Sequence, residues 1–116
     1  MDTKITNKET ARVYTWGENC KSFVLLDTKD LSVKQEVMPP NTKEKLHFHS
    51  KAQQFFYILK GEALFYLEKE LITIKQQEGI HIKPGTKHFI ENRTNSEIEF
   101  LVISQPDTTH DRIISE

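Results

Sequence analysis

The 116-residue chain lacks several features that would place it in familiar classes of protein. A single cysteine, Cys20, excludes an intrachain disulfide. Lysine and arginine number 16 and aspartate and glutamate 17, so the formal charge of −1 leaves no excess of cations for binding a nucleic acid. The longest apolar run, residues 55–59, is far shorter than the ~18 residues of a membrane span. We therefore expect neither a nucleic acid nor a membrane as a partner.

The N-terminus also has no hydrophobic stretch of the kind found in secretory signals. Together with the lone cysteine, which does not require an oxidising compartment, this favours a cytoplasmic protein. Seven Phe, three Tyr and one Trp are more aromatic residues than a disordered chain normally carries. We expect one domain over residues 1–116, with a polar N-terminal segment 1–10, a core of about residues 21–104 and a C-terminal tail 105–116.

Short runs of period-two alternation between apolar and polar residues fill the chain from about residue 11 to residue 104. No window has the apolar stripe of a helix. Many short antiparallel strands at this spacing predict an all-β sandwich or barrel. The expected strands lie near residues 11–15, 23–26, 31–37, 45–49, 53–60, 62–67, 71–75, 80–82, 88–92 and 97–104.

Two of these strands raise questions about what covers them. Residues 55–59 are apolar on both faces, so the outer face is covered either by another segment or by a second copy, and we favour a homodimer. In the strand 31–37 the apolar residues alternate with polar ones and predict an apolar inner face. Gln35 falls on that face, either as a satisfied core amide or as a pocket-lining group.

The residue pair His47 and His49 is the first candidate for chemistry. Residues two apart on a strand point to the same face, about 6–7 Å apart, so the two imidazoles can grip one ion through bonds of ~2.0–2.1 Å. His88 follows the turn 83–87 and can reach the same point from another strand. His81 points away from its apolar neighbours and is expected on the exterior or at an interface.

The spacing around these histidines resembles the first motif of the cupin superfamily. That motif runs glycine, five residues, His-x-His, three or four residues, Glu, six residues, Gly. Here His47 and His49 are followed by Gln54 and Gly61 in register, and Asn41 replaces the first glycine.

Residues 77–92 resemble the second cupin motif, which contains Pro-x-Gly, two residues, His, three residues and Asn. Gly85, His88 and Asn92 match it. Gln77 replaces its first glycine, and we expect Gly79 to form that turn instead. The chain is thus identified as similar to small single-domain bacterial cupins of unassigned activity.

This resemblance implies a jelly-roll β-barrel of two antiparallel sheets. It also implies one divalent transition metal ion held by His47, His49, Gln54 and His88, where Gln54 replaces the usual glutamate. Fe, Ni, Zn, Mn and Cu all suit imidazole ligands. Because Gln54 brings no charge, the ion would keep its full +2 and bind more weakly than beside a carboxylate. Phe56 and Ile58 share a face with Gln54 and are expected to line the pocket.

Three functions fit these observations. The first is a small metal-dependent enzyme of dioxygenase, isomerase or lyase type that acts on a small organic anion or sugar-like substrate. The second is a non-catalytic protein that binds a small molecule. The third is a metal-free sugar isomerase or epimerase that uses the pocket histidines for proton transfer. The fold does not choose among them.

Overall fold

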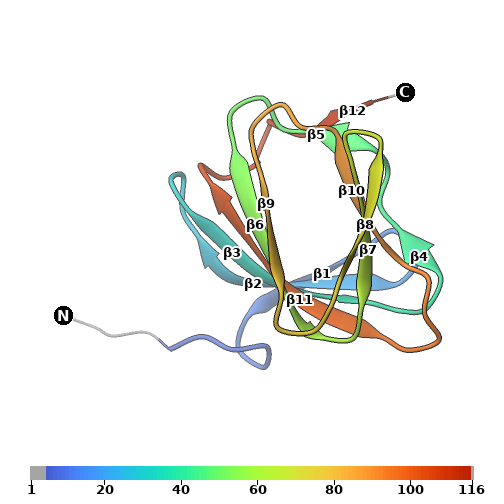
Figure 1. Ribbon diagram of the computed structural model, residues 1–116. Helices are drawn as coiled ribbons and strands as arrows, with labels where there is room; N and C mark the ends of the chain where they lie inside the picture. The colour runs from blue at the N-terminus through green and yellow to red at the C-terminus, as the bar shows by residue number, and fades with distance from the viewer. Residues whose placement is uncertain (1–4, 116) are drawn as a thin grey trace.

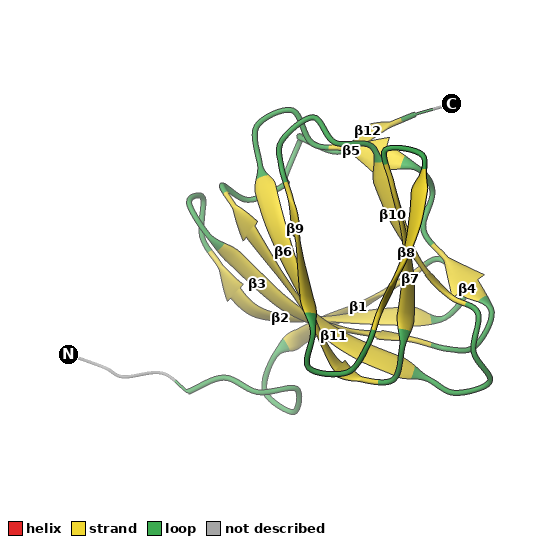
Figure 2. Cartoon of the chain, viewed as in Figure 1, coloured by secondary structure: helices red, strands yellow, loops and turns green. Residues whose placement is uncertain are grey.

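The protein is described by a computed structural model that covers residues 5–115, in which antiparallel strands are joined by turns and loops (Figure 1, Figure 2). Residues 1–4 of the expected polar N-terminal segment lie outside this range. The strands are β1 (Arg12–Trp16), β2 (Cys20–Asp27), β3 (Ser32–Met38), β4 (Thr42–Lys43), β5 (His47–Phe48), β6 (Gln53–Lys60), β7 (Ala63–Leu67), β8 (Glu70–Ile74), β9 (Gly79–Ile82), β10 (His88–Asn92), β11 (Ile98–Gln105) and β12 (Ile113–Ile114).

These strands form two six-stranded antiparallel sheets that face each other. The first, sheet A, has the order β1-β2-β3-β11-β6-β9. The second, sheet B, has the order β12-β5-β10-β7-β8, with β4 paired to β10. The sheets are not hydrogen-bonded into a closed barrel, yet the all-β architecture of two antiparallel sheets is the predicted one. Within residues 5–115 no helix is long and apolar enough to cross a membrane.

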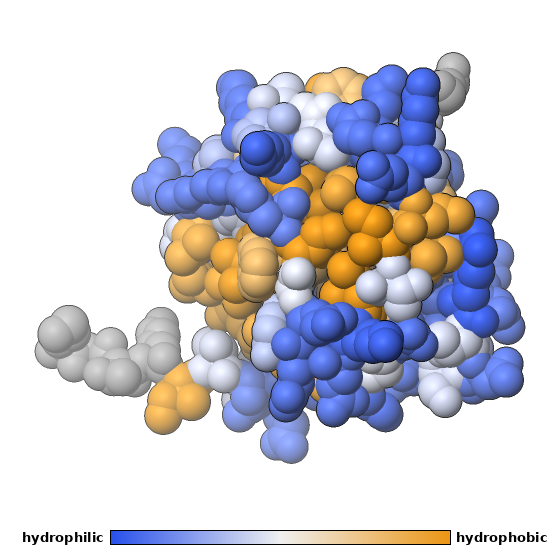
Figure 3. Space-filling model, in the orientation of Figure 1, coloured by the Kyte–Doolittle hydropathy of each residue, from blue (hydrophilic) through white to orange (hydrophobic). Residues whose placement is uncertain are grey.

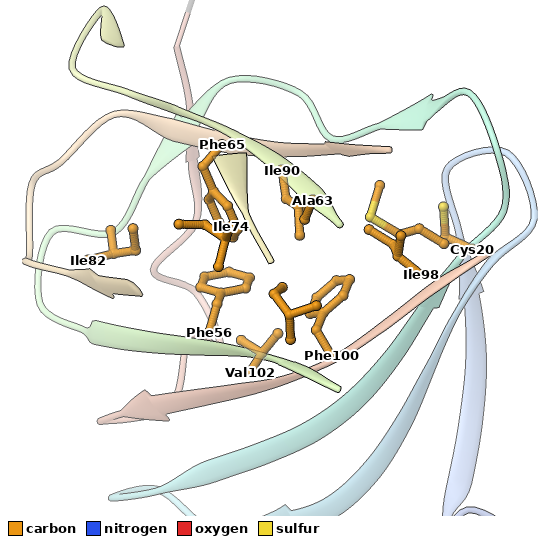
Figure 4. Packing of buried hydrophobic residues seen from close by; sticks show 12 residues of the cluster. Cys20, Phe56, Ala63, Phe65, Ile74, Ile82, Ile90, Ile98, Phe100 and Val102 are labelled. Atoms are coloured by element: carbon orange, nitrogen blue, oxygen red, sulfur yellow. The ribbon is translucent and has the colours of Figure 1, made fainter. Parts of the chain in front are cut away.

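The hydrophobic core lies between the two sheets (Figure 4). It is built from aromatic rings and branched side chains of both sheets. The centroid of the Phe56 ring lies 5.0 Å from that of Phe65, in an edge-on arrangement, and 5.9 Å from that of Phe100, in a tilted one. Ile58, Phe65 and Phe100 are fully buried. The aromatic residues thus supply the core that the sequence predicts.

Most expected strands are present, and two short ones were not predicted. β4 lies between the strands expected at residues 31–37 and 45–49, and β12 lies in the C-terminal tail. The prediction that Gly79 forms the turn before β9 is wrong, because Gln77 itself adopts the positive φ of 65° there. Gly79 instead allows a close approach, since a Cβ at this position would lie 2.4 Å from the Phe55 ring.

The predicted inner face of β3 is also wrong. Glu36, not Gln35, is the register partner of the buried Phe100, whereas Gln35 pairs with Leu101 on the outer face of sheet A. There the amide of Gln35 donates to Glu99 at 2.6 Å. Val33 and Val37 therefore face outward together with Gln35, whereas Lys34 and Glu36 face inward on the same side as the core residue Met38.

The outer face of sheet A carries apolar side chains that no other described segment of the chain buries completely. Phe55 is 40% exposed and Leu59 36% exposed, and the Phe55 and Tyr57 rings stack with centroids 6.5 Å apart. Elsewhere on the surface, Figure 3 shows apolar side chains gathered in the middle of the view, around the strand edges at β9 and β8. β6 thus carries apolar side chains on both faces, as the sequence predicts.

Candidate metal centre

Three histidine side chains meet between the two sheets. His47 lies on β5, His49 follows directly after it, and His88 begins β10 as the register partner of His47. The ring centroids are 4.4 Å apart for His47 and His88, 5.1 Å for His47 and His49, and 5.7 Å for His49 and His88. None of the three is more than 4% exposed. The structure brings together the three imidazoles that the sequence analysis singled out.

Each of the three rings has one nitrogen committed to the backbone. Nδ1 of His47 donates to the carbonyl of Lys45 at 2.7 Å. Nδ1 of His49 donates to the carbonyl of Asp111 at 2.8 Å, and Nδ1 of His88 donates to that of Thr86 at 2.7 Å. A carbonyl can only accept, so the proton of each neutral ring is on Nδ1 and each Nε2 presents a lone pair.

The free nitrogens have the character of metal ligands. The buried Nε2 of His49 has no hydrogen-bond partner among the described residues. One ring nitrogen of each histidine lies within 4.8 Å of those of the other two. Bonds of ~2.0–2.1 Å place ligand atoms about 3–3.5 Å apart, so small side-chain movements suffice to close on an ion. The three buried histidines could therefore hold a metal ion.

The surroundings keep these imidazoles neutral. Burial lowers the pKa of His47 to about 3 and outweighs the hydrogen bond to Lys45, which acts in the opposite direction. Burial likewise lowers the pKa of His88 to about 4. At neutral pH both rings are in the unprotonated form that a metal ion requires.

Gln54 lies beside the histidines on β6 and is 7% exposed. Its amide nitrogen donates to the Ser104 hydroxyl at 3.0 Å, and its carbonyl oxygen lies 3.2 Å from Nε2 of His88. Because the proton of His88 is on Nδ1, this contact places two acceptor atoms, Nε2 of His88 and Oε1 of Gln54, next to each other. A cation between or beside them would turn this repulsion into attraction, so the amide oxygen also fits a ligand role.

Asp111 is a residue of the site that the sequence analysis missed. Its backbone carbonyl holds His49, and its carboxylate accepts hydrogen bonds from Ser50 N at 2.9 Å, Ser50 Oγ at 2.6 Å, Lys51 N at 3.0 Å and Ala52 N at 2.9 Å. Burial alone would raise the pKa of Asp111, but these hydrogen bonds lower it to about 2. An aspartate in a polar tail gives no sequence signal, because its partners are 59 to 61 residues away.

His47 and His49 open onto a cavity of about 920 Å³ between the β1–β3 side of sheet A and the β4–β5 side of sheet B. Phe56, Glu36, Glu44 and Arg112 are among its lining residues. Burial raises the pKa of Glu36, and burial together with the charge of Glu36 raises that of Glu44 to about 8. Neither carboxyl nor Arg112 is predicted from the sequence, because Glu36 alternates with apolar residues and was expected to face solvent, while Glu44 and Arg112 lie outside the expected strands.

Comparison with known proteins agrees with this architecture. The family model for the cupin domain matches residues 34–104. The chain belongs to the cupin family. The cupin motifs therefore occur here within the matching fold, with Gln54 in place of glutamate.

The chain is also similar to individual proteins and to a solved structure. An uncharacterised protein of Methanocaldococcus jannaschii is 34% identical over 69% of this cupin and 64% of its own length. An oxalate-binding protein of Thermotoga maritima is 33% identical over 57% of this chain and 54% of its own. The matches thus span less than two thirds of these relatives. A protein of Klebsiella pneumoniae with a double-stranded β-helix domain superposes with a TM-score of 0.82 at 20% identity and covers 99% of both chains.

The cavity contains only part of the expected pocket wall. Phe56 lines it, and its ring centroid lies 6.4 Å from that of His88. Ile58 faces inward as expected but is fully buried in the core. Gln35 is on the opposite side of sheet A, so a pocket-lining role for it is wrong. His81 is exposed and 2.8 Å from Gln53 Oε1, away from the other imidazoles.

Proposed function

We propose that this cupin is a small metal-dependent enzyme that binds one divalent transition metal ion through His47, His49 and His88, with the amide oxygen of Gln54 as a fourth ligand. The observation that supports this most is the set of three buried, neutral imidazoles whose Nδ1 protons are all given to carbonyls. When bound, the ion supplies a Lewis acid with further coordination positions open to a ligand.

The residues around this centre favour a small anionic or sugar-like ligand. Among the described residues the cluster that could hold the ion consists of three neutral histidines, and Gln54 beside it contributes only an amide dipole, so the ion would keep its charge. Arg112 adds a positive charge whose effect reaches all three histidines. Phe56 and Val102 on the cavity wall exclude water from the side of sheet A and strengthen these electrostatic interactions.

Metal binding is tested by elemental analysis of protein purified without chelator, followed by calorimetric titration of the stripped protein with Ni²⁺. We expect one ion per chain in the wild type and none in a His47→Ala, His49→Ala double variant. His81→Ala is the matched control, because it removes an exposed imidazole outside the cluster, and it should bind as the wild type does. A folded wild type without saturable Ni²⁺ binding would overturn the proposal.

A non-catalytic binding function is the second candidate. It is favoured by the relative of Thermotoga maritima that is named an oxalate-binding protein. Incubation of the Ni²⁺-loaded and Fe²⁺-loaded protein with small carboxylic acids, followed by NMR, separates the two functions. A ligand that binds and is recovered unchanged with every metal favours the carrier, and a product that is absent with the double variant favours the enzyme.

We also propose that two copies pair through the outer face of sheet A. Phe55, Tyr57 and Leu59 on β6 lie beside Leu101 and Ile103 of β11 on this face. Apolar side chains this far exposed over neighbouring strands are the composition of an interface rather than of a solvent face.

A further inference from the structure

Two glutamate side chains, those of Glu36 and Glu44, line the wall of the same cavity. Glu36 comes from β3 of sheet A and is 8% exposed, and Glu44 comes from the loop after β4 of sheet B. Glu44 is fixed from two sides, because its backbone N–H donates to the carbonyl of Ile90 at 3.0 Å and its Oε1 accepts the N–H of Ile90 at 3.1 Å. One carboxyl oxygen of Glu44 is thus engaged, and the other is available at the cavity.

Within the described part of the chain, neither carboxyl has an ion-pair partner. The ion pairs found within residues 5–115 join other groups, namely Lys8 with Glu99, Arg12 with Asp27 and Arg93 with Glu91. The charge of Arg112 is near enough to affect both glutamates but does not pair with either.

A third polar group at the same cavity also lacks a partner. The indole N–H of Trp16, another lining residue, has no hydrogen-bond acceptor in the described part of the chain. Buried polar groups are nearly always satisfied in a working protein, so a donor without an acceptor at a cavity that two carboxyls also line favours a polar ligand.

We infer that Glu36 and Glu44 form a hydroxyl-binding subsite, so that the substrate is a hydroxylated monocarboxylic acid of the sugar-acid type. Its carboxylate lies at Arg112 and the histidines, and its hydroxyl groups reach the two glutamates. The inference deepens the proposed function and rests on it for the carboxylate end.

The chemistry of the pair matches a hydroxyl group. Because burial raises the pKa of both carboxyls, and that of Glu44 to about 8, the pair retains a proton near neutral pH. One carboxyl then donates a hydrogen bond while the other accepts, and a hydroxyl group both accepts and donates. A second carboxylate at this place would be repelled, and an alkyl chain would offer neither carboxyl a hydrogen-bond partner.

The spacing between Glu36 and the metal end requires a chain of several carbons. Glu36 pairs with Phe100 on β11, whereas Gln54 beside the histidines pairs with Ser104 of the same strand. Four residues along a strand correspond to about 13 Å between these rows, part of which is spanned by the side chains themselves. A two-carbon diacid such as oxalate fits the metal end alone.

Calorimetric titration with three six-carbon acids tests the subsite, in metal-free and in Ni²⁺-loaded protein side by side. Gluconate carries hydroxyl groups, hexanoate carries none, and adipate has a carboxylate at each end. We expect gluconate to bind at least about tenfold more tightly than hexanoate or adipate. In Glu36→Met and Glu44→Met, which keep the length of the side chain but remove its polar atoms, this preference for gluconate over hexanoate should disappear.

The ratio of the two affinities is the readout, because a general loss of fold lowers both. Glu36→Gln tests the repulsion of a second carboxylate, because removal of the charge of Glu36 should strengthen the binding of adipate. Glu70→Gln, on β8 and outside the cavity, should keep the wild-type ratio.

A wild-type ratio near one, no gluconate binding, or a ratio unchanged in both Met variants would overturn the inference. If Ni²⁺ does not bind but the ratio persists in metal-free protein, the proposed metal function fails and the subsite stands. If Ni²⁺ binds and the ratio is near one, the subsite fails and the metal function stands.

Discussion

Asp111 should control both the stability of the fold and the affinity of the metal centre, although it is not a ligand. In Asp111→Asn the side chain keeps one acceptor oxygen, and its new NH₂ group faces at least one backbone N–H of the loop at residues 50–52. That N–H loses its acceptor, and the remaining hydrogen bonds lose their charge. Charge-assisted bonds contribute about 1.5–3 kcal/mol each, so we expect a loss of about 2–4 kcal/mol in the free energy of unfolding.

The corresponding change in melting temperature follows from the size of the chain. At roughly 2.1 cal/mol/K per residue, 116 residues give an unfolding entropy of about 0.24 kcal/mol/K. Each kcal/mol then lowers the midpoint by about 4 °C, so Asp111→Asn should melt about 8–16 °C below the wild type. Differential scanning calorimetry of metal-free protein measures this shift.

The same substitution should weaken Ni²⁺ binding about 10- to 100-fold, because the carbonyl of Asp111 orients His49 and the loosened tail no longer fixes that ring. Asp107→Asn is the matched control, since Asp107 lies in the same tail and, among the described residues, its carboxylate accepts no hydrogen bond. If Asp111→Asn lowers the melting temperature but leaves Ni²⁺ affinity at the wild-type value, the positioning role of this residue is refuted.

Three further predictions address other parts of the molecule. Gln54→Glu should bind Ni²⁺ at least about tenfold more tightly, because it adds a negative charge and the Ser104 hydroxyl can donate to it; unchanged affinity in a folded variant would contradict this. The pKa of Glu44 in the folded protein is about 8, above the ordinary 4.5. The folded state therefore keeps its full stability below pH 4.5, and the contribution of the protonated carboxyl to the free energy of unfolding is lost as the pH rises through 8. Glu44→Gln, which cannot titrate, should therefore gain roughly 3–5 kcal/mol relative to the wild type between pH 4.5 and 8.5, and urea unfolding at both values would reveal a missing gain. Phe55→Glu should convert a dimer to a monomer in sedimentation velocity without loss of fold, and a wild type that is already monomeric at high concentration would exclude the pairing of sheet A.

The sequence predicts the strands well because alternation and turn residues are local properties. The strand expected at residues 53–60 coincides with β6, and that expected at 88–92 coincides with β10. The short strands β4 and β12 are not predictable in this way. Each has two residues and owes its existence to pairing with β10 or β5, whose positions depend on the whole fold.

The orientation of β3 could not be predicted from its own residues. The rule that apolar side chains face inward assumes that a core lies on the inner side and water on the outer side. Here a polar cavity lies on the inner side, where Glu36 and Lys34 face it, and apolar neighbours from β11 and β6 cover part of the outer side. Gln35 therefore points outward to Glu99 although the alternation predicts the reverse.

The inverted face of β3 and the role of Asp111 have a common origin in the C-terminal tail. This tail pairs β12 with β5, holds His49 through the carbonyl of Asp111 and carries Arg112 to the cavity that Glu36 faces. A carboxyl on the inner side of a sheet is tolerable because the cavity and the nearby guanidinium reduce the cost of its burial. The last residues of the chain thus connect the histidines with the glutamate wall, and no local pattern in residues 31–38 contains that information.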